Sequence, residues 1–142
     1  MLPPIHPSLQ LLSRDPPARD SDVADLRERF PHVPQEYVEL VSEGTEIQLQ
    51  DATGRYFRIW GPSGCIEMDE AYGISQRIPN AISIGDDGGG QVIFYHHGSH
   101  GFGVYCVGYG NLDADDAIWI APTLIDVLSR ATGITSLGSS ND

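Results

Sequence analysis

The chain has 142 residues, 40% of them hydrophobic and 20% charged, and its formal net charge is −12. This length and composition are typical of one globular domain that buries its own core. All eight basic residues are arginine, so no lysine is present to form a Schiff base or to bind a phosphate.

The excess negative charge limits the kinds of partner. It would repel a phosphate backbone, so we expect no nucleic acid as a partner. It would attract and steer a basic protein. The alternative is that the acidity only maintains solubility.

The two cysteines, Cys65 and Cys106, lie in apolar, strand-like segments, where buried free thiols are common. No CxxC spacing indicates zinc, and two distant cysteines define no disulfide framework. The N-terminal segment has no basic leader, and no apolar run approaches the roughly 18 residues that a membrane span needs. We therefore expect a protein of the reducing cytoplasm without a membrane anchor.

The first predicted elements are an arm and a helix. Five of the ten prolines fall in residues 1–20, so this segment is expected to be a loosely attached arm, with at most a turn or two of helix in "SLQLLSR". A helix is expected over 20–30, because Val23, Leu26 and Phe30 recur at helical spacing.

A second helix is expected over 34–44. Pro34 suits its first turn and Gly44 its C-terminal stop. The pattern predicts an inward face of Tyr37, Leu40 and Val41 and a solvent face of Glu36, Glu39 and Glu43.

From residue 46 the pattern alternates, which predicts about six strands. In "CIEMDEAY", residues 65–72, the alternation places Ile66 and Met68 inward and Glu67 and Asp69 outward. The candidate strands are 46–50, 55–60, 65–72, 81–84, 91–95, 103–109 and a looser segment at 115–121. Nine of the sixteen glycines fall between Gly85 and Gly110, which predicts bulges and a strongly curved sheet.

A last helix is expected over 122–133, with an apolar stripe of Leu124, Ile125 and Leu128 and Gly133 as its stop. Short turns between successive strands require antiparallel pairing. We therefore predict one α+β domain over 21–133, a curved antiparallel sheet of about six strands with two N-terminal helices and one C-terminal helix. Residues 134–142 are expected to be a flexible tail.

The segment "GDDGGG", residues 85–90, is the most unusual in the chain. It lacks the GK[ST] of a phosphate loop and the acidic spacing of an EF-hand, and a strand rather than a helix follows it. We expect the glycines to adopt positive φ, and Asp86 and Asp87 to be solvated and to cap N–H groups of the turn. Acid–base catalysis by this carboxylate pair is the less favoured interpretation, since it needs a cleft that shifts their pKa values.

The chain contains two further polar clusters. His96, His97 and His100 lie close together within "YHHGSHG". In a tight turn His97 and His100 could meet around a metal, but a solvated turn is the favoured interpretation. The acids at 113, 115 and 116 are also expected in a solvated loop. No GxSxG motif occurs, and Ser63 has no evident base beside it.

Four segments in this order resemble the SUKH superfamily, a group of bacterial immunity proteins and fungal cell-wall-assembly regulators. They are the proline-led helix "VPQEYVELVSEG", Trp60-Gly61 after an early strand, "IPNAISIGDDGGGQVIFY", and "GVYCV" followed by "WIAPTLIDVL". The resemblance covers roughly residues 22–132.

The resemblance implies a non-catalytic immunity protein, without cofactor or metal, that binds a cognate toxin domain and blocks it. A basic, nuclease-like toxin would suit the acidic chain. Tyr72 is a candidate aromatic anchor, whereas Trp60 is expected in the core. The candidate partner-binding residues are Glu67, Asp69, Glu70, Tyr72, Asp86, Asp87, Asp113, Asp115 and Asp116.

Two alternatives stay open at this point. One is a regulatory interaction module of the same fold with a cellular partner. The other is a metal-dependent enzyme that uses His96, His97, His100 and nearby acids.

Overall fold

Seven strands form one open antiparallel sheet whose spatial order follows the chain order, β1 to β7, in the computed structural model, which describes residues 2–138. The α+β class and the antiparallel pairing are therefore confirmed. The strands are β1 Leu9–Asp15, β2 Thr45–Asp51, β3 Tyr56–Ile59, β4 Ile82–Asp86, β5 Gln91–Gly98, β6 Gly101–Gly108 and β7 Ile118–Ala121.

Within residues 2–138, five α-helices accompany the sheet, two more than the sequence pattern predicts. They are α1 Asp20–Arg29, α2 Gln35–Val41, α3 Pro62–Tyr72, α4 Ile74–Arg77 and α5 Leu124–Arg130. Short 3₁₀ turns occur at η1 Tyr109–Asn111, η2 Ala114–Asp116 and η3 Ile134–Ser136. No helix within residues 2–138 has the length and apolarity that a membrane crossing requires.

The N-terminal segment contributes strand β1, where the sequence suggested at most a short helix. β1 pairs with β2 from Leu9 opposite Asp51 to Asp15 opposite Thr45. Leu9 is buried, and Leu2 and Ile5 pack against the core. The prolines on either side stop the strand but leave its own N–H groups free to pair.

Residues 62–72 form helix α3 and not the predicted strand. Pro62 lies in its first turn, and Gly73 ends it with a φ of 63°. Its buried residues, Pro62, Cys65 and Asp69, recur at helical spacing. Because one of the three is a carboxylate, the inward face does not look apolar in the sequence. The expected outward orientation of Asp69 was therefore wrong.

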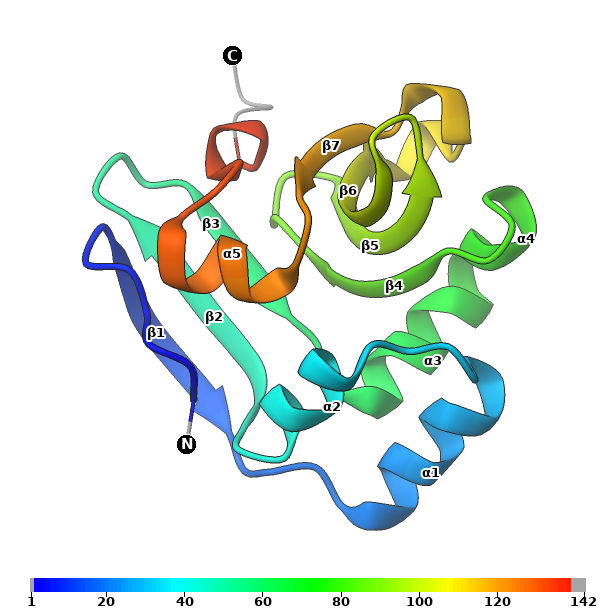
Figure 1. Ribbon diagram of the computed structural model, residues 1–142, viewed down its shortest axis with the longest axis horizontal. Helices are drawn as coiled ribbons and strands as arrows, with labels where there is room; N and C mark the ends of the chain where they lie inside the picture. The colour runs from blue at the N-terminus through cyan, green and yellow to red at the C-terminus, as the bar shows by residue number, and fades with distance from the viewer. Residues whose placement is uncertain (1, 139–142) are drawn as a thin grey trace.

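The sheet is strongly curved, as the glycine density predicts. Strands β4 to β7 curl tightly in Figure 1, while β1 to β3 run straighter. The pairing shifts register between Ser83 and Gly85 and between Val104 and Tyr105. At Gly85 a Cβ atom would lie 2.1 Å from the backbone oxygen of Arg58, so only glycine allows β3 and β4 to approach this closely.

The helices cover the sheet largely as predicted. Tyr37, Leu40 and Val41 are buried, and the Tyr37 hydroxyl donates to the backbone oxygen of Trp60 over 2.5 Å. Trp60 is itself in the core, as expected.

In α5, Ile125 is exposed and Val127 is buried instead. The predicted flexible tail covers residues 134–142. Leu137 within it is buried, and residues 139–142 lie outside the described residues.

Candidate partner-binding surface

The Gly-Asp turn between β4 and β5 has a structural role, because hydrogen bonds to its two carboxylates hold it in place. Asp86 and Asp87 are only 7% and 3% exposed, so the expectation of solvated carboxylates was wrong. Their predicted role as turn caps is confirmed: Asp86 accepts from the N–H of Gly88 over 2.9 Å, and Asp87 accepts from that of Gly89 over 2.8 Å. Gly88 has a φ of 70°, as predicted.

Asp87 holds the turn to the C-terminal segment. It also accepts from the N–H of Gly138 over 2.9 Å and from both the backbone and the side-chain amide of Gln91. Burial by itself would raise the pKa of Asp87, but the hydrogen bonds from Gly138, Gln91 and Gly89 lower it below its ordinary value. The carboxylate is therefore held in its charged form.

Asp86 ties the turn to strand β3. It accepts from the indole N–H of Trp60 over 2.8 Å and from the Arg58 guanidinium over 3.0 Å. Arg58 neutralises much of its charge, so Asp86 presents little free negative charge to a partner.

Asp69 is also a buried anchor. It accepts two hydrogen bonds from Arg29 on α1, at 3.1 and 2.8 Å, and two from the backbone and hydroxyl of Ser75, both at 2.8 Å. These contacts fasten α1 to α3 and to the start of α4. A side chain that is 1% exposed cannot contact a partner directly.

The remaining predicted acids are exposed. Glu67 and Glu70 lie on α3, with Glu70 at 3.2 Å from Arg29. Asp113, Asp115 and Asp116 lie in and beside η2. Local hydrogen bonds fix part of this loop, because Asp113 accepts from the N–H of Asp115 over 2.9 Å and Asp116 accepts from the Asn111 amide over 2.7 Å.

An aromatic contact joins the end of α3 to η1, the turn that precedes η2 in the chain. The rings of Tyr72, at the end of α3, and Tyr109, in η1, lie 4.5 Å apart. Tyr72 is 46% exposed. We use the name tyrosine–acid surface for these two tyrosines together with the exposed acids of α3 and of the η2 loop. Its members are Glu67, Glu70, Tyr72, Tyr109, Asp113, Asp115 and Asp116.

Tyr109 is the member that sequence reasoning missed. Burial, followed by the nearby carboxylate of Asp86, raises its pKa above the ordinary value, so the phenol stays neutral. Its buried hydroxyl has no hydrogen-bond partner among residues 2–138. Nothing in "VGYGN" distinguishes it, since only the tertiary fold places it on Tyr72.

The three histidines do not converge on a common point. Neighbouring residues of β5 face opposite sides of the sheet: His96 is buried beside Tyr105, whereas His97 is exposed beside Phe102. His100 stacks on Trp119 with ring centroids 5.2 Å apart. In the described part of the chain, no three His, Cys, Asp or Glu side chains are grouped so that they could hold a metal ion.

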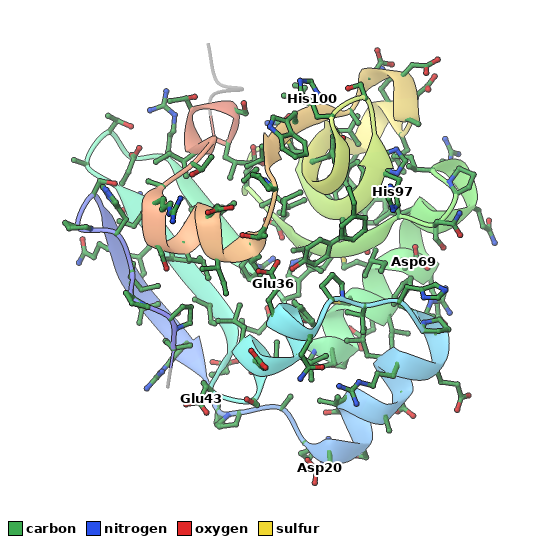
Figure 2. All side chains as sticks on the ribbon, viewed as in Figure 1. Asp20, Glu36, Glu43, Asp69, His97 and His100 are labelled. Atoms are coloured by element: carbon green, nitrogen blue, oxygen red, sulfur yellow. The ribbon has the colours of Figure 1, made fainter. Side chains whose placement is uncertain are left out.

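Glu36 has a structural role that the sequence concealed. It was expected to face water, but it accepts from the Tyr95 hydroxyl and from the N–H groups of Leu124 and Ile125. Figure 2 shows it in the interior of the view, whereas Asp20 lies at the periphery, on α1. Glu36 therefore belongs to the scaffold and not to a binding surface.

Comparison with protein-family models and with curated proteins gives no match for this chain.

Proposed function

We propose that the protein is a non-catalytic immunity protein that binds a cognate toxin domain, of basic and nuclease-like character, and blocks its active groove. The observation that carries this proposal is the tyrosine–acid surface, where an aromatic pair joins two segments that both carry exposed carboxylates. The resemblance to the SUKH superfamily supplies the class of partner.

The chemistry of the surface suits a basic partner. Its exposed carboxylates would steer a positively charged domain and pair with arginine or lysine side chains at the rim. Tyr72 offers a large, partly apolar ring of the kind that often anchors an interface. Loop residues that are already hydrogen-bonded lose little further conformational freedom on binding.

Within this proposal the predicted acids have two roles. The exposed members of the tyrosine–acid surface contact the partner. Asp69, Asp86 and Asp87 act indirectly, because they hold α3 and the Gly-Asp turn in position.

Affinity capture of the tagged protein from its source cells, at low and at high salt, tests the proposal. We expect one stoichiometric basic partner with a toxin-like domain, retained less well at high salt. Capture of several housekeeping proteins in its place would contradict the proposal and favour the regulatory module.

A charge-matched pair of variants then tests the surface. Converting Asp113, Asp115 and Asp116 to Asn should weaken binding of the captured partner roughly tenfold or more, measured by calorimetry. The control converts Asp15, Asp20 and Glu39, exposed on β1, α1 and α2, to Asn, Asn and Gln. An equal loss in the control would mean that only net charge matters, and unchanged binding in the first variant would exclude this surface.

A further inference from the structure

A groove on another part of the molecule has a chemistry unlike that of the acidic surface. It has a volume of about 780 Å³ and lies where the α1–α2 connection, the α4–β4 turn and the β5–β6 hairpin meet. Residues that line it include Arg29, Phe30, His32, Asn80, His97 and Phe102. Figure 2 shows His97 on the hairpin and Asp69, the partner of Arg29, on the same side of the view.

The groove lacks the acids that are abundant elsewhere. No Asp or Glu lines it, whereas at least one carboxylate lines each of four other pockets in residues 2–138. In a chain with a net charge of −12, a groove without a lining carboxylate repels a negatively charged ligand less than those four pockets do.

Polar donors in the groove are available to a ligand. The structure shows no hydrogen-bond partner within residues 2–138 for the side chains of His32, Asn80 and His97. Arg29 is committed to buried Asp69 through Nε and Nη2, but its Nη1 contacts only Glu70, whose side chain is 61% exposed. An exposed ion pair of this kind is weak, so an entering anion can displace Glu70 at small cost.

Apolar walls complete the groove. Phe102 is 42% exposed and its ring lies 4.9 Å from that of His97. Phe30 and Ile82 also line the groove and are largely buried. The lining of the groove is mixed, with polar and apolar residues in similar number. Its volume lies in the usual range of small-molecule sites.

We propose that this groove binds a small organic carboxylate with an aromatic or aliphatic body. The carboxylate accepts a hydrogen bond from Nη1 of Arg29 in place of Glu70, and the apolar body packs between Phe30 and Phe102. The site adjoins the tyrosine–acid surface through Glu70, which pairs with Arg29, but the proposal does not depend on the toxin-binding function.

The test uses 4-phenylbutyrate as the probe and 4-phenylbutyramide as its uncharged analogue. Titration of the full chain, followed by ¹H–¹⁵N spectra, should shift the amides of Asn80, Ala81, His97 and Phe102 with the acid. The amide analogue should bind roughly tenfold more weakly, because it cannot form the charge-assisted hydrogen bond. Equal binding of the two compounds, or no shifts in this groove at about 10 mM acid, would overturn the proposal.

Two exposed positions give matched variants. Glu70→Gln should tighten binding of 4-phenylbutyrate roughly twofold to fivefold, since it removes the carboxylate that competes for Arg29. Phe102→Ala should weaken it roughly fivefold through the lost apolar contact. Both side chains are exposed, and circular dichroism checks that each variant is folded. Unchanged affinity in either variant contradicts the corresponding contact.

Discussion

At the scale of single residues, the acids divide into two classes that the sequence does not separate. Asp69, Asp86 and Asp87 are buried, and each has several donors to its carboxylate. Burying a charge without such partners would cost several kcal/mol. The donor network therefore explains why carboxylates are tolerated at these sites.

Asp87→Asn tests this explanation. In Asn, an NH₂ group would replace the oxygen that now accepts from the N–H of Gly138 and from the Gln91 side-chain amide. A donor would then face these two donors. We expect the free energy of unfolding at neutral pH to fall by about 2 kcal/mol, measured by urea denaturation. The exposed control, Asp25→Asn on α1, should change it by less than about 0.5 kcal/mol.

The stability difference between the wild type and Asp87→Asn should also depend on pH, in a direction that the pKa of Asp87 defines. The pKa of Asp87 is lowered in the folded protein, so its ionised form stabilises the fold above the unfolded-state pKa of about 3.9. That stability is lost as the pH falls through the lower, folded-state pKa. The gap in stability between the wild type and Asp87→Asn should therefore narrow below about pH 4. A constant gap down to about pH 2 would show that ionisation of Asp87 contributes nothing.

At the scale of elements, one carboxylate connects α2, β5 and α5. Glu36 accepts from the Tyr95 hydroxyl over 2.7 Å and from the N–H groups of Leu124 and Ile125 over 2.7 and 3.2 Å. The last two are among the first N–H groups of α5, which have no partner within the helix. Glu36 thus supplies a cap for α5 from another helix.

Glu36→Ala should lower the free energy of unfolding by about 2 kcal/mol, because it removes this cap and leaves the Tyr95 hydroxyl unpaired. Thermal and urea denaturation measure the change. Glu39→Ala, at an exposed position of the same helix, is the matched control and should have little effect. Similar losses in both variants would indicate a general effect on α2 and not a cap on α5.

Helices and strands were predictable from the sequence where one of their faces is apolar. The prediction failed where no face is apolar. Helices α1, α2 and α5 and strands β2 to β7 all lie close to the segments that the pattern indicates. Helix α3 was missed because buried Asp69 breaks its apolar stripe, although Pro62 and Gly73 are ordinary boundary signals of a helix. Strand β1 was missed because only Leu9 of its residues is buried. The segment therefore lacks the alternation of apolar and polar residues that indicates a strand.

At the scale of the whole molecule, the net charge of −12 should oppose the compact state. Like charges are closer together in the folded protein than in the unfolded chain, and salt screens their repulsion. We therefore expect the free energy of unfolding to rise between about 0.02 M and about 0.5 M NaCl. The variant with Asn, Asn and Gln at 15, 20 and 39 should show a smaller rise in the free energy of unfolding with salt. If this free energy falls with salt in the wild type, ion pairs such as Arg58–Asp86 dominate over the general repulsion.

The sequence by itself determined the α+β class, the antiparallel pairing, the glycine-dependent curvature and the overall acidity, because each follows from local periodicity, turn length or composition. Only the tertiary structure decided which acids are buried and which segments become neighbours. Tyr72 meets Tyr109, and Glu36 meets the start of α5, across long stretches of chain. The physical reason is that the burial of a carboxylate depends on donors from distant segments, such as Gly138 for Asp87, and no local pattern encodes where those donors come to lie.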